Sequence, residues 1–193
     1  AIKDGTLAQS PVLLKMIATL KANGKACHLM GLMSPGGVHS MQNHILALAE
    51  IISGAGVPVW IHAFLDGRDT PPSSAVDYLA QFEKDIAGLK NVKLATIEGR
   101  FYAMDRDKRW DRVEKAYNNM VFAAGVRYAT ADEAIKASYN DKVTDEFVIP
   151  AVIGNYQGMQ DGDAILMCNF RADRAREILY ALADKDFDGF ARK

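Results

Sequence analysis

The sequence has few cysteines, no excess of charge and no long apolar run, and each absence excludes a class of protein. Its two cysteines, Cys27 and Cys168, lie in apolar strand-like stretches, where a buried free thiol is favoured over a disulfide or a metal ligand. The 23 Lys and Arg residues against 24 Asp and Glu give a formal net charge of -1, which argues against nucleic-acid and membrane-surface partners. No stretch approaches the roughly 18 apolar residues of a membrane span.

Recognisable targeting and nucleotide-binding patterns are also missing. The first residues, Ala1 to Gly5, show no signal-peptide pattern, so we expect a cytoplasmic protein. The chain opens without a methionine, and we therefore expect it to be a fragment of something longer. It contains no Walker loop and no Gly-x-Gly-x-x-Gly pattern, which leaves nucleotide binding without a motif. We find no internal repeat and no linker, which favours one domain.

Apolar runs alternate with amphipathic stretches along the chain, and this alternation predicts the fold class. It favours an α/β protein with three layers, α/β/α, around a mostly parallel and possibly mixed sheet. The predicted strands cover residues 25–33, 57–65, 92–97 and 164–170, with a strand-like stretch at 147–149 before Pro150. The predicted helices cover residues 11–23, a stretch from near His39 to 53, 75–86, 110–124, a short helix opened by a Thr130/Glu133 capping box, and 175–182.

Polar clusters follow four of the predicted strands. In open α/β sheets, ligands bind at the carboxyl ends of the strands, so we expect these clusters to meet in one strongly cationic cleft. The clusters cover residues 36–40, 66–70, 99–107 and 169–174.

Two arginines in the last cluster are placed to hold an anion. Arg171 and Arg174 are three residues apart at the predicted start of a helix, so they lie on one face and can clamp one anion. The unpaired N–H groups of the helix N-terminus would add to this site. The alternative is that each arginine forms a surface ion pair with an acid such as Asp173 or Glu177.

The second cluster pairs an arginine with an acid on a stiff loop. Gly67 permits a tight turn, and the two prolines that follow Thr70 stiffen the chain. Arg68 can take a carboxylate or phosphate by bidentate bonding, while Asp69 can accept a hydroxyl proton, as a general base must. The alternative is an Asx-turn combined with an internal ion pair.

The histidines do not predict a metal centre. His39 follows Gly36 and Gly37 and is predicted to open a helix. His39 and His44 are five residues apart, the wrong spacing for two ligands on one helical face, so we expect no metal site in this chain. His28 and His62 lie within predicted strands and are expected to be core groups.

In this order, the clusters resemble the signatures of the bisphosphoglycerate-independent phosphoglycerate mutases. Residues 32–40, 62–69, 99–107 and 169–174 carry the resemblance. One departure is Ser34-Pro35, where the family usually has Ser-Asp, and no direct chemistry is expected there. The resemblance covers essentially the whole chain but implies only one of two domains, with residues 1–193 as the substrate-binding, or phosphotransferase, domain. It places the metal-binding, phosphatase-like domain with its nucleophilic serine outside this chain.

The resemblance implies an isomerase of glycolysis that interconverts 3-phosphoglycerate and 2-phosphoglycerate through a phosphoserine. Two divalent cations, usually manganese, would be held in the other domain, and this chain alone would be inactive. The implied partners are 2-/3-phosphoglycerate and the protein's own phosphatase domain, in a monomer. Asp69 would handle the hydroxyl proton, Arg68 and His39 would orient glycerate, and four arginines would hold phosphate and carboxylate. The implied substrate contacts are His39, Arg68, Asp69, Arg100, Arg106, Arg171 and Arg174.

Two other functions compete with this interpretation. A non-catalytic binding module for small phosphorylated hydroxy acids would need the same arginines but no acid–base aspartate. A self-sufficient phosphatase is disfavoured, because the sequence offers neither a clustered Asp/His set for two metals nor an activated serine motif.

Overall fold

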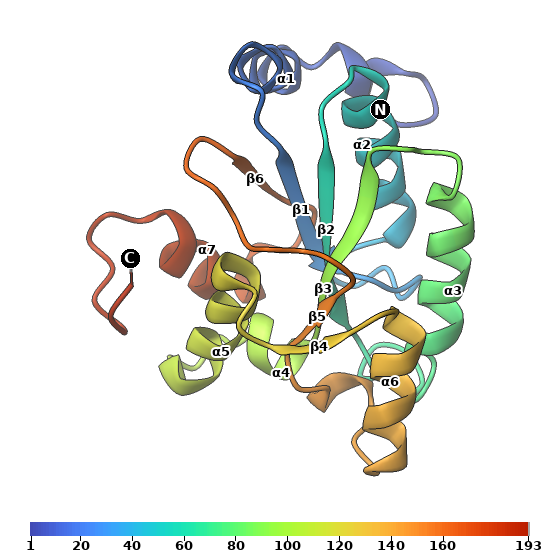
Figure 1. Ribbon diagram of the computed structural model, residues 1–193, viewed down its shortest axis with the longest axis vertical. Helices are drawn as coiled ribbons and strands as arrows, with labels where there is room; N and C mark the ends of the chain where they lie inside the picture. Colours follow the sequence, from blue (N-terminus) through green and yellow to red (C-terminus); the bar gives the residue numbers. More distant parts are fainter. Residues whose placement is uncertain (193) are drawn as a thin grey trace.

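A six-stranded mixed sheet forms the centre of the computed structural model, which describes residues 1–192 (Figure 1). The strand order is β4-β5-β3-β2-β1-β6, and only the β3–β5 pair is antiparallel within the described residues. The prediction of a mostly parallel, mixed sheet is confirmed. The strands are β1 Cys27–Leu32, β2 Val59–Leu65, β3 Val92–Gly99, β4 Val126–Tyr128, β5 Ala151–Ile153 and β6 Ala164–Met167.

Helices cover both faces of the sheet and complete the predicted three layers (Figure 1). One face carries α1 Pro11–Asn23, α2 Gln42–Gly54, α3 Ala75–Ile86 and α6 Ala131–Asn140. The other carries α4 Arg100–Ala103, α5 Trp110–Phe122 and α7 Arg176–Ala183. Three short 3₁₀ turns are η1 Thr6–Gln9, η2 Asp145–Phe147 and η3 Ala172–Arg174. No helix within residues 1–192 has both the length and the apolar character needed to cross a membrane.

The central strands read as continuous apolar runs because helices cover both faces of the sheet. Leu29 and Ile61 pack toward α1, α2 and α3, whereas Met30 and Phe64 pack toward α5 and α7. Successive strand side chains point to opposite faces, and both faces of this sheet are covered. Cys27 and Cys168 are buried and free, as predicted.

Local signals at the helix ends act as the sequence predicts. Pro11 occupies the first turn of α1, and Gly24 ends the helix in the left-handed conformation with φ 63°. At α6 the Thr130 hydroxyl accepts the Glu133 N–H at 3.2 Å. The Glu133 carboxylate accepts the N–H of Ala129 at 3.1 Å, one residue before the donor of a standard capping box.

The strand predicted at 147–149 is wrong, because the segment before Pro150 is held by tertiary contacts. Asp145 is buried and its Oδ2 accepts the N–H groups of Ser74 and Ala75, both at 2.9 Å, at the start of α3. The segment then crosses Gly99, where an added Cβ would lie 2.2 Å from the Glu146 carbonyl oxygen. The strand begins only after the proline, as β5.

Two predicted boundaries near the loops are also wrong. The helix expected from near His39 starts at Gln42, because the His39 carbonyl accepts N–H groups from Phe170 and Arg171 instead. The strand expected to reach residue 170 ends at Met167. Beyond it, the side chain of Asn169 replaces the backbone ladder and accepts the Leu32 N–H at 2.9 Å.

The edge strand β4 was not predicted from the sequence. Its three residues follow Gly125, and Val126 is 61% exposed. So short a segment shows no period-two pattern, and its pairing with β5 alone makes it a strand.

Candidate functional site

The candidate site lies where the direction of strand order reverses. Strands β2 and β3 extend the sheet on one side of β1, while β6 adds on the other side. The carboxyl ends of β1 and β6 therefore mark the topological switch point, the usual ligand position in such sheets. The His39 carbonyl joins the loops that follow these two strands by accepting the N–H of Phe170 at 2.9 Å and of Arg171 at 3.4 Å.

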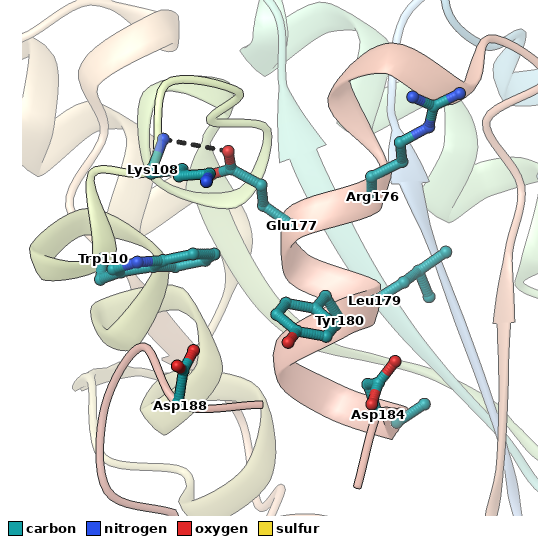
Figure 2. A pocket seen from close by; sticks show the side chains of 9 residues that line it. Lys108, Trp110, Arg176, Glu177, Leu179, Tyr180, Asp184 and Asp188 are labelled. Atoms are coloured by element: carbon teal, nitrogen blue, oxygen red, sulfur yellow. Dashed lines mark hydrogen bonds between the residues drawn. The ribbon is translucent and has the colours of Figure 1, made fainter. Parts of the chain in front are cut away.

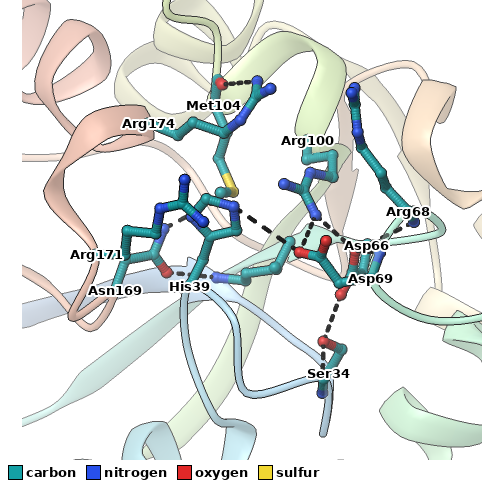
Figure 3. A network of polar contacts seen from close by, with 12 residues as sticks. Ser34, His39, Asp66, Arg68, Asp69, Arg100, Met104, Asn169, Arg171 and Arg174 are labelled. Carbon is teal, nitrogen blue, oxygen red and sulfur yellow. Dashed lines mark hydrogen bonds and ion pairs between the residues drawn. The ribbon is translucent and has the colours of Figure 1, made fainter.

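Asp66 organises the loop after β2, and it is 1% exposed. Its Oδ1 accepts the N–H of Arg68 at 3.2 Å and of Asp69 at 2.9 Å, so the Asx-turn weighed as an alternative is present. Its Oδ2 accepts the Ser34 hydroxyl at 2.6 Å (Figure 3). The turn fixes the direction in which Arg68 and Asp69 leave the loop.

Arg100 at the start of α4 joins the two acids of this loop (Figure 3). Its Nη1 donates to Asp66 Oδ1 at 2.7 Å and to Asp69 Oδ2 at 2.6 Å, and its side chain is 3% exposed. Burial alone would raise the pKa of Asp66, but the Ser34 hydroxyl, the Asp69 N–H and the Arg100 guanidinium lower it below its usual value. Arg100 is thus already paired inside the protein.

His39 lies between two acids and is buried. Its Nε2 lies 3.8 Å from Asp69 Oδ2, and its Nδ1 lies 3.7 Å from Asp173 Oδ1. Burial and the nearby Arg100 charge lower the pKa of His39 more than the two acids raise it. The imidazole is therefore neutral at neutral pH. We call Ser34, His39, Asp66, Asp69 and Arg100 the buried polar cluster.

Three arginines at the rim are exposed and pair with acids. Asp173 accepts Arg171 Nε at 2.9 Å on Oδ1 and Arg106 Nη1 at 3.2 Å on Oδ2. Arg68 lies 3.4 Å from Glu146 Oε1. We call Arg68, Arg106 and Arg171 the exposed arginines; their side chains are 56%, 47% and 48% exposed. For Arg171, the ion-pair alternative is therefore realised.

Arg174 differs from the other arginines of the site because it donates to a carbonyl and not to an acid. Its Nη1 donates to the Met104 carbonyl at 3.2 Å, and within residues 1–192 no acid lies within ion-pair distance of it. Burial and the positive charges of Arg106, Arg100 and Arg68 lower the pKa of Arg174. Arg174 ends the η3 turn, Arg171 directly precedes that turn, and α7 starts only at Arg176, so the predicted helix N-terminus is not beneath them.

Four arginines line one hollow of about 360 Å³ together with Glu146 and Phe147: Arg68, Arg100, Arg106 and Arg174. The structure thus brings all seven predicted site residues into one region, with His39, Asp69 and Arg171 joined through the ion pairs above. A concentration of guanidinium groups at one opening suits a small ligand with several negative charges.

A larger hollow, of about 710 Å³, lies between α5, α7 and the C-terminal segment (Figure 2). Trp110 and Tyr180 line it with Arg176 at one end and Asp184 at the other. Its charges are of mixed sign, and it lies away from the loops after β1 and β2. The smaller arginine-lined hollow is therefore the better candidate for an anion site.

His28 and His62 form a buried chain within the sheet. His28 Nδ1 lies 2.9 Å from His62 Nε2, and His62 Nδ1 lies 2.8 Å from Thr96 Oγ1. This confirms that they are core groups. Across residues 1–192, no group of three or more His, Cys, Asp or Glu side chains is placed to hold a metal ion.

Sequence reasoning named Asp173 only as an ion-pair alternative for Arg171 and Arg174, and it gave no role to Asp66 or Glu146. Asp66 carried a signal, because it directly follows a strand and precedes Gly67. Asp173 stands between Arg171 and Arg174, and only its loop conformation turns it toward Arg106. Glu146 lies 78 residues from Arg68, and no local pattern connects the two.

Comparison with known proteins places the chain among its relatives. The phosphoglycerate mutase of Rhodopseudomonas palustris, described as 2,3-bisphosphoglycerate-independent, is 55% identical over 193 residues, 100% of this chain and 38% of that protein. The equivalent protein of Gluconobacter oxydans is 54% identical over 96% of this chain and 36% of its own length. The chain thus spans well under half the length of these curated relatives.

A solved structure agrees with the fold. A structure of Leishmania mexicana phosphoglycerate mutase, obtained at low cobalt concentration, superposes with a TM-score of 0.91 at 32% identity, over 98% of this chain and 37% of that one. The family described as BPG-independent PGAM N-terminus matches residues 1–193. The chain belongs to this family, the N-terminal part of the bisphosphoglycerate-independent phosphoglycerate mutases.

Proposed function

We propose that residues 1–193 form the substrate-binding, or phosphotransferase, domain of a mutase that interconverts 3-phosphoglycerate and 2-phosphoglycerate. The observation that carries the proposal is the arginine-lined hollow beside a buried Asp69–Arg100 pair. A phosphoglycerate has a phosphate, a carboxylate and a hydroxyl. The site offers several guanidinium groups for the first two and a carboxylate for the third.

The arginines differ in how freely they can bind such a ligand. Arg174 donates to a neutral carbonyl, so a ligand anion does not have to displace an acid from it. The exposed arginines hold Asp173 and Glu146 in solvent-accessible pairs, and such pairs are weak. A phosphate or carboxylate can therefore replace these acids as partner. Arg100 also lines the hollow and contacts the ligand's phosphate or carboxylate in this proposal, while its pairs with Asp66 and Asp69 hold the loop in place.

Asp69 is the proposed acid–base residue. Its carboxylate is 18% exposed, more than any other side chain of the buried polar cluster, and a ligand hydroxyl can reach it. In the second transfer its carboxylate takes the proton of the attacking hydroxyl, and in the first transfer of the next cycle the resulting acid gives that proton to the oxygen that leaves the phosphorus. Arg68 and the neutral imidazole of His39 orient the glycerate between the first and the second transfer. The arginines neutralise charge on the transferring phosphoryl group, the main requirement of this chemistry.

The phosphoserine and two divalent cations, manganese by the family resemblance, belong in this proposal to the rest of the enzyme. The Leishmania structure was obtained with cobalt, which supports a divalent ion in relatives. The described residues 1–192 offer no cluster that fits a metal, so no step on this chain runs through one. We also propose that the enzyme is cytoplasmic and monomeric, with its own phosphatase domain as the partner of this one.

Two proteins test the proposal: the full enzyme that contains this chain, and residues 1–193 alone. We expect the full enzyme with manganese to convert 3-phosphoglycerate and the chain alone to be inactive. Turnover by the chain alone would contradict the assignment of the transfer chemistry to the other domain. A full enzyme without mutase activity that still binds 3-phosphoglycerate would favour the binding-module alternative.

A further inference from the structure

The loop that carries Arg106 turns around a buried acid, Asp105, which is 5% exposed. Its Oδ2 accepts the N–H groups of Asp107 and Arg109, both at 2.9 Å. Arg112 from α5 lies 3.4 Å from its Oδ1, and the Arg112 guanidinium stacks 3.8 Å from the Phe101 ring centroid. These contacts fix the shape of the loop from its own backbone and from α5.

Glu177 approaches the same loop from α7. Its Oε1 accepts the Lys108 N–H at 3.0 Å (Figure 2). Its Oε2 is buried and has no donor among the described residues. The Asp105 and Glu177 carboxyl groups are neighbours, because Asp105 binds the N–H groups on both sides of Lys108 while Glu177 binds the N–H of Lys108 itself, and each acts on the other's pKa. Two ionised carboxylates have no hydrogen to share. The contact becomes a hydrogen bond only when a proton lies between them.

The charges around the pair place that proton on Glu177. Burial and the charges of Asp105 and Asp107 raise the pKa of Glu177, although the Lys108 N–H opposes this. Burial alone would raise the pKa of Asp105. The Arg109 and Asp107 N–H groups, the bond to Glu177 and the Arg112 charge lower this pKa more than burial raises it. The charged groups that act on the Asp105–Glu177 pair are Arg112 on α5 and Asp107 on the loop.

We propose that Glu177 is a positioning residue that donates a hydrogen bond from its carboxylic acid to Asp105, and so ties the Arg106 loop to α7. Glu177 lies three residues after Arg174, so this bond sets the separation of two arginines of the hollow. The inference rests on the proposed function, in which one ligand is held between them. As the pH rises past the pKa of Glu177, the shared proton leaves, two carboxylates repel each other, and the loop loosens.

Two substitutions at this position in the full enzyme separate a positioning role from a merely structural one. Glu177→Ala removes the tie, and we expect the KM for 3-phosphoglycerate to rise about tenfold with a smaller change in kcat. Glu177→Gln keeps an oxygen for the Lys108 N–H and supplies an N–H to Asp105 at every pH. We therefore expect it to keep a near-normal KM and to lack the rise of KM that we expect for the wild type when Glu177 loses its proton. Glu50→Ala, an exposed glutamate on α2, is the matched control and should leave KM unchanged.

Hydrogen exchange of the Asp107 and Arg109 amides gives a second readout that needs no mutase activity. We expect exchange about tenfold faster in Glu177→Ala than in wild type, and unchanged in Glu177→Gln. An unaltered KM in a folded Glu177→Ala enzyme, or equal losses in both variants, would overturn the inference. A wild-type enzyme without mutase activity would overturn the proposed function, while the exchange rates would still decide whether Glu177 holds the loop.

Discussion

Arg100 and Arg171 both pair with acids, but the Arg100 pairs are buried and the Arg171 pair is at the surface. The Arg100 side chain is 3% exposed and shared between Asp66 and Asp69, whereas Arg171 is 48% exposed and holds Asp173 alone. A buried pair that loses one member leaves an uncompensated charge, while a surface pair is replaced by water at little cost. The buried polar cluster is thus suited to fix geometry, and the exposed arginines are suited to exchange partners.

The largest effect should come from Asp69, the most exposed member of the buried polar cluster. In the full enzyme, Asp69→Asn keeps the size of the side chain and can still accept a hydrogen bond, but it cannot take up a proton. We expect kcat to fall roughly 100- to 10,000-fold with a much smaller rise in KM, measured by steady-state kinetics. A near-normal kcat with weaker binding would make Asp69 a binding residue only and favour the binding-module alternative.

A comparable loss, in stability, should follow removal of the cation from the buried polar cluster. Arg100→Ala leaves Asp66 and Asp69 close together without a counter-charge. We expect the free energy of unfolding of residues 1–193, measured in urea, to fall by about 3 kcal/mol or more. Arg171→Ala is the surface counterpart and should change it by less than about 1 kcal/mol. Equal effects from the two substitutions would remove the distinction between the buried and exposed pairs.

Arg174 tests the opposite expectation, a large effect on activity with little on stability. Arg174→Lys keeps the charge but loses the planar fork that binds an oxyanion through two N–H groups. Loss of one such charge-assisted bond costs on the order of 1.5 to 3 kcal/mol, so kcat/KM of the full enzyme should fall roughly tenfold to a hundredfold. Arg176→Lys, an exposed arginine on α7, is the control, and kinetics unchanged at both positions would remove Arg174 from the ligand site.

The smallest effect concerns the pH dependence of stability. The pKa of His39 is lowered in the folded protein from its ordinary value of 6.5, so the unfolded chain binds its proton more readily. The neutral imidazole therefore stabilises the fold above pH 6.5, and this contribution is lost as the pH falls below that value. We expect His39→Gln to flatten the decrease in unfolding free energy between about pH 7 and 5, measured by urea titrations at a series of pH values. An unchanged slope would contradict a buried, neutral His39.

The sequence predicted the elements that have local signals and missed those that depend on distant contacts. Pro11 and Gly24 delimit α1, and Thr130 starts α6, because capping acts within a few residues. The strand expected at 147–149 failed because Asp145 binds the start of α3, about 70 residues away along the chain. That contact outweighs the local preference of an apolar run.

The candidate site follows the same division. The seven expected residues lie together because they follow neighbouring strands, which is a consequence of topology. The acids that hold them are contributed by contacts that span the chain, as Glu146 does for Arg68. These acids can be identified only from the folded arrangement of the loops.

The backbone at Gly99 packs against the 146–148 segment, which borders the arginine-lined hollow. The space where a methyl group would stand is occupied by the Glu146 carbonyl, and the Gly99 N–H donates to Val148 at 2.8 Å. Even an alanine there must push the 146–148 backbone outward, away from Arg68 and from the wall that Phe147 gives to the arginine-lined hollow. The tolerance of this protein to mutation is therefore uneven: a residue with no side chain, and no chemistry of its own, is among the least replaceable around the hollow.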